Sequence, residues 1–244
     1  MPDFLDFEGR RLAYRLRAGS SPTLLFLPGY ASDMEGSKAV AIDAFAQRRG
    51  LAMLRFDYSG TGSSAGSFAD GTLDAWIDDA LAMIDKLTKG PLLLVGSSMG
   101  GWIALHLALR RPKRVQALVG IAAASDFTNW GFTADQKQEL LEEGRIERSN
   151  PYGGDSQLTT RAFWQSGEAL RLLDGPIAVD CAVRLVHGEA DQDVPVAMAM
   201  RLMDRLRSAD VQLDILKGGG HRLSEPREID AILRTIAALV EPCP

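Results

Sequence analysis

The sequence predicts one α/β domain with a mostly parallel sheet of about eight strands. Short, continuously apolar runs recur from residue 23 onward, and segments with helical spacing separate them. Continuous apolar character is typical of strands buried on both faces of a parallel sheet. The alternation of strand and helix then predicts helices on both faces. The predicted parallel strands are TLLFL (23–27), LAMLRF (51–56), PLLLVG (91–96), VQALVGI (115–121), VRLVHG (183–188) and VQLDIL (211–216).

Helical periodicity fills most of the intervals between these strands. The last predicted helix begins beside Ser224 and Pro226, a capping residue followed by an early proline. Residues 4–17 predict an antiparallel hairpin at one edge of the sheet. The predicted helices lie at about 36–49, 72–88, 98–110, 195–208 and 225–240.

Residues 126–175 interrupt this alternation with about fifty residues of mixed character. The segment TADQKQELLEEG (133–144) predicts a short polar helix, and a turn rich in proline and glycine follows it. RAFWQSGEALRLL then resumes helical spacing. We expect a small cap, inserted over one end of the sheet within a single domain of residues 1–244. The aromatic residues of this segment are Trp130, Phe132, Tyr152, Phe163 and Trp164.

Composition excludes several classes of protein. The chain has 244 residues and a net charge of −5, with no block of lysine and arginine, which argues against a nucleic-acid partner. It has no apolar run of the ~20 residues that span a bilayer, and its N-terminal residues lack an apolar signal core. Cys181 and Cys243 are far apart in sequence, which favours a reducing compartment over a disulfide scaffold. We therefore expect a cytoplasmic protein.

Two segments match the pattern G-x-S-x-G, namely GSSAG at 62–66 and GSSMG at 96–100. The first lies in a polar loop, where we expect the Ser64 hydroxyl to be merely solvated. The second follows a buried strand directly and opens a helix, which is the strand–turn–helix context of a nucleophile elbow. The strained turn requires glycine on both sides of the serine, and the helix N-terminus directs N–H groups at developing negative charge. The context favours Ser98 as a nucleophile over an ordinary tight turn.

A serine nucleophile needs a base, and the sequence has three histidines. His106 falls in the middle of an apolar helix and is expected to be a core residue. His187 ends a strand, where a structural role is favoured. His221 follows the glycines of KGGGH after the last strand, so its loop can place the imidazole at the edge of the sheet that carries the elbow. We select His221, the alternative being an exposed loop histidine.

The base needs a carboxylate to hold its tautomer. Asp191 follows the strand before last, and Asp193 lies two residues further on, where it could instead cap the next helix. Asp126 is another carboxylate at a strand end. We rank Asp191 first, because Ser98, Asp191 and His221 then follow in the chain order of α/β-hydrolases.

An oxyanion hole would complete the site. One donor is expected to be the N–H of Met99, directly after the nucleophile. The other is expected from the loop LPGYASD after the first parallel strand, with Tyr30 as the backbone donor and Gly29 allowing close approach.

These motifs together resemble a known family. FLPGY, RFDYSGTGSS, VGSSMGGW, HGEADQDVP and GHR at 220–222 follow in the order of the α/β-hydrolase superfamily. More narrowly, the chain is similar to the group that contains the mitochondrial palmitoyl-protein thioesterase of animals, which also hydrolyses drug acyl glucuronides. That similarity lies in LPGYASDMEGSKA, RFDYSGTGSS and GSSMGGW. The resemblance covers about residues 22–240. It implies the same triad and no metal or organic cofactor. The chain starts almost at its first strand, without the arginine- and serine-rich leader of those relatives, which again favours the cytoplasm.

The function expected is hydrolysis of carboxylic esters or thioesters through an acyl-serine intermediate. The substrate would be a small or lipidated acyl compound, with Trp130, Phe132 and Trp164 of the cap lining an acyl pocket. An acyltransferase or carbon–carbon hydrolase could use the same triad. The alternative to an enzyme is a non-catalytic ligand receptor on the same fold. A dinucleotide site at GTGSSAG is disfavoured, because the third glycine is misplaced and no helix opens there.

Overall fold

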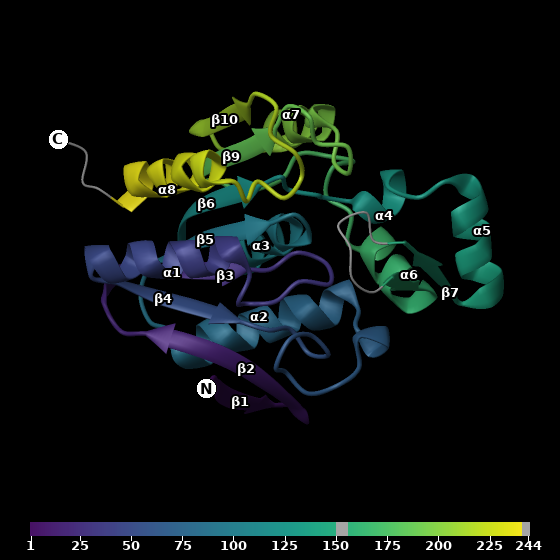
Figure 1. The fold of residues 1–244 in the computed structure, drawn as a ribbon, viewed down its shortest axis with the longest axis horizontal. Helices are drawn as coiled ribbons and strands as arrows, with labels where there is room; N and C mark the ends of the chain where they lie inside the picture. Colours follow the sequence, from purple (N-terminus) through teal and green to yellow (C-terminus); the bar gives the residue numbers. More distant parts are fainter. Residues whose placement is uncertain (150–155, 241–244) are drawn as a thin grey trace.

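The computed structural model of the protein describes residues 1–149 and 156–240. It contains an eight-stranded sheet in the order β1-β2-β4-β3-β5-β6-β9-β10 (Figure 1). The β1–β2 and β2–β4 pairs are antiparallel and the other neighbours are parallel, which confirms the predicted sheet and its antiparallel edge. The strands are β1 (Asp3–Phe7), β2 (Arg10–Arg17), β3 (Ser20–Leu27), β4 (Leu51–Phe56), β5 (Leu92–Ser97), β6 (Val115–Ile121), β9 (Ala182–Gly188) and β10 (Val211–Leu216).

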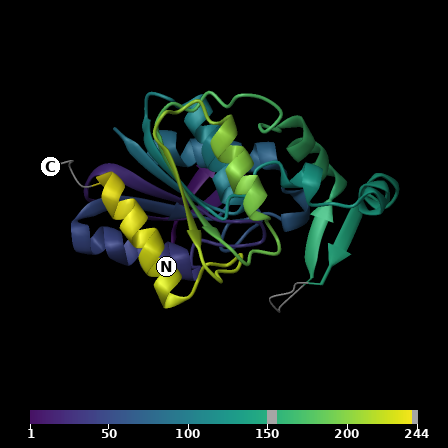
Figure 2. The same cartoon turned by 90° about the horizontal axis from the view of Figure 1, so that it is seen from above.

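Two hydrophobic cores lie on opposite faces of this sheet. In β3, the side chains of Leu25 and Leu27 belong to one core, and those of Leu24 and Phe26 belong to the other. Helices α2, α3 and α7 contribute to the first core, and α1 and α8 to the second, so helices cover both faces (Figures 1 and 2). Their bounds are α1 (Ser37–Arg49), α2 (Leu73–Leu87), α3 (Met99–Arg110), α7 (Val196–Arg205) and α8 (Pro226–Val240).

The segment between β6 and β9, here called the inserted segment, lies beyond the C-terminal ends of the parallel strands (Figure 1). The expected polar helix is α5, which begins at a capping box formed by Thr133 and Gln136. The sequence pattern missed the antiparallel pair β7–β8, because four residues carry too little periodicity to recognise. Tyr152 lies outside the described residues. The elements are α4 (Phe127–Trp130), α5 (Ala134–Glu143), β7 (Arg145–Arg148), β8 (Gln157–Thr160) and α6 (Arg161–Ala169).

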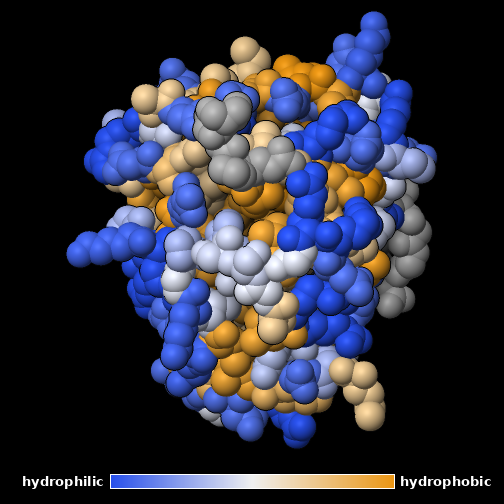
Figure 3. Space-filling view, turned by 90° about the vertical axis from the view of Figure 1, so that its left-hand side faces the viewer, coloured by the Kyte–Doolittle hydropathy of each residue, from blue (hydrophilic) through white to orange (hydrophobic). Residues whose placement is uncertain are grey.

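The opposite end of the molecule presents a mixed surface. Polar side chains cover much of it, with apolar side chains visible between them (Figure 3). Over the described part of the chain, every helix is too short or too polar to cross a membrane. Cys243 lies outside the described residues, and Cys181 is a free thiol.

Candidate active site

Ser98 occupies the sharp turn between β5 and α3. Its backbone has φ 53° and ψ −119°, a region that a residue with a Cβ rarely adopts. A Cβ on Gly96 would lie 2.2 Å from the Gly100 carbonyl oxygen, and one on Gly100 would lie 2.0 Å from the Leu27 carbonyl oxygen. Both flanking glycines are therefore required by backbone that passes directly beside them. The turn exposes Ser98 to the cavity at this end of the sheet.

His221 lies in the loop between β10 and α8 and reaches the serine. Its Nε2 atom is 3.1 Å from the Ser98 Oγ, and its Nδ1 atom is 2.9 Å from Oδ2 of Asp191. The ammonium group of Lys38, on α1, donates a hydrogen bond to the carbonyl oxygen of Arg222 and so ties this loop to the main body. Side chains 123 and 30 residues apart in sequence are thus brought into one line.

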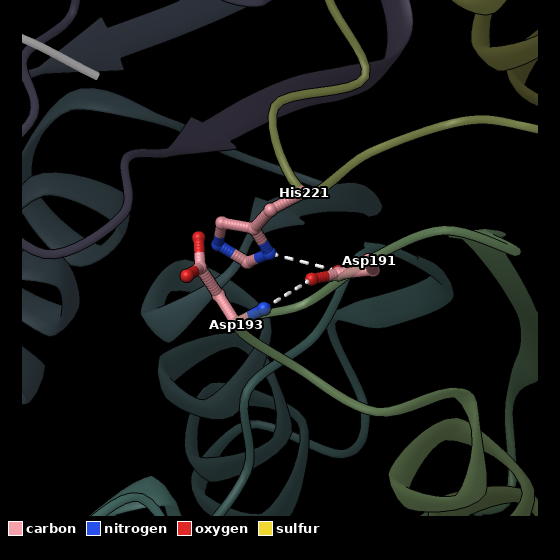
Figure 4. A group of neighbouring side chains, drawn as sticks. All are labelled: Asp191, Asp193 and His221. Atoms are coloured by element: carbon pink, nitrogen blue, oxygen red, sulfur yellow. Dashed lines mark hydrogen bonds and ion pairs between the residues drawn. The ribbon is translucent and has the colours of Figure 1, made fainter. Parts of the chain in front are cut away.

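Asp191 follows β9, and its carboxylate is fully engaged. Oδ2 accepts from His221, and Oδ1 accepts from the N–H group of Asp193 at 2.9 Å (Figure 4). Oδ1 also accepts from the N–H group of Val194 at 2.8 Å. Burial opposes ionisation of this carboxyl group, but the hydrogen bonds from His221 and from the Val194 N–H outweigh it and hold the pKa of Asp191 below its ordinary value. The carboxylate is therefore ionised and oriented to stabilise an imidazolium at His221.

His187 touches the same carboxylate, although its position at a strand end suggested only a structural role. Its Nε2–H donates to the carbonyl oxygen of Val194 at 2.8 Å and lies 3.4 Å from Oδ2 of Asp191. The side chain is buried. His187 thus stabilises the loop that carries Asp191. In the sequence, the only signal for this contact is that the histidine ends a strand four residues before the acid.

The Asp193 carboxylate lies beside the imidazole of His221 (Figure 4). Among the described residues, Asp191, Asp193 and His221 are the one group whose ligand atoms, all within 4.8 Å of one another, could hold a metal ion. Two of the three are already paired through a hydrogen bond that a bound cation would have to break. The arrangement therefore suits proton transfer better than metal binding.

The other candidates considered from sequence lie elsewhere. His106 is buried in α3, its Nε2–H donates to the Leu170 carbonyl oxygen at 3.0 Å, and desolvation lowers its pKa to about 4. Asp126 accepts hydrogen bonds from the N–H groups of Leu172 and Leu173, so it fixes the chain returning from the inserted segment and not His221.

Ser64 corrects one expectation. Its hydroxyl is not merely solvated: it donates to the Asp57 carbonyl oxygen at 2.7 Å and accepts from the Ala13 N–H at 2.8 Å. The GSSAG segment at 62–66 is therefore a structural loop held against β2, and its serine hydroxyl is engaged in two backbone hydrogen bonds.

The turn after β3 lies against Ser98. A Cβ on Gly29 would come within 3.3 Å of the Ser98 Cβ, so the backbone of Tyr30 begins directly beside Ser98. Met99 is the first residue of α3, and its N–H is one of those that a helix leaves without an intrahelical acceptor. The two predicted oxyanion donors thus belong to backbone on either side of the serine.

A cavity of about 730 Å³ opens above Ser98 and His221. Trp130 and Phe132 are among the residues that line it. Trp164 is absent from the described residues that line it, and its indole N–H donates to the Thr128 carbonyl oxygen at 3.1 Å. Sequence reasoning missed several lining side chains, because the inserted segment and α1 approach the cavity only in the folded chain. These are Lys38, Phe127, Arg148, Thr159 and Arg222.

Comparison with known proteins identifies the fold and the family. The family model of the alpha/beta hydrolase fold matches residues 22–166. The chain belongs to the α/β-hydrolase family. It is 40% identical over 234 residues to the mitochondrial palmitoyl-protein thioesterase ABHD10 of Homo sapiens, covering 94% of this chain and 76% of that protein. These findings confirm the resemblance to that group, and the chain is a hydrolase of carboxylic ester or thioester bonds.

Solved structures agree over almost the whole length. The alpha/beta hydrolase domain-containing protein 10 from mouse superposes with a TM-score of 0.92 at 38% identity, covering 98% of each chain. A structure from Agrobacterium vitis S4 gives the same TM-score and identity over 99% of this chain and 98% of that one.

The expected cytoplasmic location is wrong. The human, orangutan and mouse relatives are all named as mitochondrial proteins, which points away from the cytoplasm. The expectation rested on composition, on two distant cysteines and on the start of the sequence. These properties describe any reducing compartment and do not distinguish one from another.

Proposed function

We propose that this chain hydrolyses long-chain acyl thioesters through an acyl-enzyme formed on Ser98. One observation carries the proposal: the hydroxyl of Ser98, the imidazole of His221 and the carboxylate of Asp191 form an unbroken line of hydrogen bonds at the floor of a cavity. A serine hydroxyl becomes nucleophilic when an adjacent imidazole accepts its proton and a carboxylate stabilises the resulting charge.

The first half of the reaction acylates the serine. His221 takes the Ser98 proton as Oγ attacks the thioester carbonyl carbon, and the N–H groups of Tyr30 and Met99 stabilise the tetrahedral oxyanion. The C–S bond then breaks, and His221 returns the proton to the departing thiolate. In the second half, His221 removes a proton from water, the hydroxide attacks the acyl carbon, and Ser98 leaves with that proton. The products are a thiol and a carboxylic acid.

The inserted segment is proposed to act as the cap of the site. Phe127, Trp130 and Phe132 line the cavity on that side, and they offer an apolar surface to an acyl chain. The relatives named as palmitoyl-protein thioesterases support a long acyl chain and a thioester as the substrate class.

Thioesters of graded acyl length, with matched oxygen esters, test the substrate class. We expect the ratio kcat/KM to rise with acyl length, and thioesters to be hydrolysed faster than esters with the same acyl group. A preference for short acyl esters would contradict the proposal, because Phe127, Trp130 and Phe132 would then contact no acyl chain.

Replacing each candidate serine tests the nucleophile. Ser98→Ala should lower turnover by several orders of magnitude and abolish labelling by a fluorophosphonate probe. Ser64→Ala, in the GSSAG segment, should retain labelling because that hydroxyl bonds backbone groups. Persistent labelling of Ser98→Ala would refute the assignment. A wild-type chain that does not react with the probe would favour a non-catalytic receptor.

A further inference from the structure

The turn that carries the predicted oxyanion donor is strained. Tyr30 and Ala31 are the central residues of a turn closed by the Ser32 N–H on the Gly29 carbonyl oxygen, at 3.2 Å. Ala31 has φ 53°, which costs a residue with a Cβ on the order of 1 kcal/mol or more. Such a turn persists only where the surroundings fix it. Its orientation therefore depends on what holds the Tyr30 side chain.

The Tyr30 ring lies between the main body and the inserted segment. Its centroid is 4.7 Å from that of Phe163 on α6 and 5.9 Å from that of Phe127 on α4. Within the main body it is 5.1 Å from Phe68 and 5.9 Å from Trp76. Edge and tilted contacts of this kind stabilise aromatic pairs beyond their simple burial. The Tyr30 side chain thus contacts both the main body and the inserted segment.

The Tyr30 hydroxyl adds a directed contact. It donates a hydrogen bond of 2.6 Å to the carbonyl oxygen of Leu158 in β8, 128 residues away. Burial raises the pKa of this hydroxyl well above its ordinary value, so it remains a donor throughout the working pH range. The inserted segment is therefore tied by this hydrogen bond to the residue whose backbone N–H is the predicted oxyanion donor.

We propose that Tyr30 is a positioning residue, whose hydroxyl fixes the oxyanion turn to β8 so that the placement of the inserted segment sets the direction of the Tyr30 N–H. This inference rests on the proposed function, since it assumes that this N–H stabilises the oxyanion. An oxyanion donor acts only when it lies about 2.7–3.1 Å from the developing negative charge. A turn released from β8 would lose that alignment while the cavity walls stayed in place.

Tyr30→Phe isolates the hydroxyl, because it keeps the aromatic ring and its packing. We expect kcat for a long-chain acyl thioester to fall about tenfold with KM within twofold of wild type, since the lost contact acts only in the transition state. The rate constant for inactivation by a fluorophosphonate should fall by a similar factor, because that reaction also builds charge in the oxyanion hole.

Ser166→Ala is the matched control. The Ser166 hydroxyl also ties the inserted segment to the main body: it donates to the Asp74 carboxylate and accepts from the Asp74 N–H at 3.0 Å. It joins α6 to α2 and does not touch the oxyanion turn. We expect its kcat, KM and inactivation rate to match wild type, even if its melting temperature falls as much as that of Tyr30→Phe.

Three results would overturn the inference. The first is a Tyr30→Phe variant with kcat within twofold of wild type. The second is a rise in KM at constant kcat, which would make the hydroxyl a part of substrate binding only. The third is an equal loss of kcat in Ser166→Ala, which would assign the effect to docking of the whole segment. A wild-type chain inert to the probe would instead remove the proposed function itself, so the two failures are distinguishable.

Discussion

Ser98 differs from Ser64 in the backbone that holds it and not in its own chemistry. Both serines stand between glycines, but Ser98 has a positive φ and faces a cavity, whereas the Ser64 hydroxyl is bonded to two backbone groups. The flanking sequence predicted this difference, because only GSSMG joins a buried strand to a helix. The same reasoning underestimated Ser64, since its partner in β2 is remote in sequence.

Replacing the two aspartates that lie at strand ends should have different effects on kcat. Asp191→Asn should lower kcat by about 10³- to 10⁴-fold, because an amide neither stabilises the imidazolium nor enforces its tautomer. Asp126→Asn should leave kcat within a few-fold of wild type, because its oxygens accept only from the Leu172 and Leu173 N–H groups. Steady-state kinetics of both variants checks this. An equal loss of kcat in both variants would mean that Asp126 supports His221 as much as Asp191 does.

Among the secondary-structure elements, the elbow depends on how closely β3, β5 and α3 approach one another. Gly100 lies in the first turn of α3, and the carbonyl oxygens of Leu27 and Pro28 at the end of β3 occupy the place of its missing side chain. The helix N-terminus can therefore lie against the turn that carries Tyr30. Ser98 and both predicted oxyanion donors adjoin this one packing contact.

Gly100→Ala should destabilise the fold by at least about 3 kcal/mol, because backbone atoms must move to admit the methyl group. Gly175→Ala is the control, since a Cβ there would meet no atom within 4 Å beyond its chain neighbours. We expect the control to change stability by less than about 1 kcal/mol. Chemical unfolding in urea measures both. A Gly100→Ala variant as stable as wild type would show that β3 and α3 can separate at little cost.

For the molecule as a whole, burial of a neutral histidine links stability to pH. The pKa of His106 is about 4 in the folded chain, below its ordinary value of 6.5. The unfolded chain therefore binds more protons between these values, and this contribution to stability is lost as the pH falls from about 6.5 to about 4. The raised pKa values of Asp57, Asp79 and Asp126, which burial causes, act in the opposite direction.

His106→Gln separates these contributions. The variant removes the titrating ring while keeping a donor for the Leu170 carbonyl oxygen. Between pH 7.5 and pH 4.5 we expect the wild type to lose up to about 3 kcal/mol relative to the variant. Urea unfolding of both proteins across this range measures the difference. A constant difference in free energy of unfolding would show that His106 has an ordinary pKa in the folded chain.

Local pattern in the chain was enough to predict the sheet, its covering helices and the strand ends at which Ser98, Asp191 and His221 stand. These features follow from periodicity, from glycines beside a strained residue and from chain order. All three can be read from the sequence without knowledge of the tertiary packing. The folded molecule alone shows which side chains line the cavity, why Trp164 turns away from it, and that the Tyr30 hydroxyl meets Leu158. Such contacts join positions more than a hundred residues apart or across the inserted segment, and no local pattern encodes them because their energies arise only when the separate elements pack together.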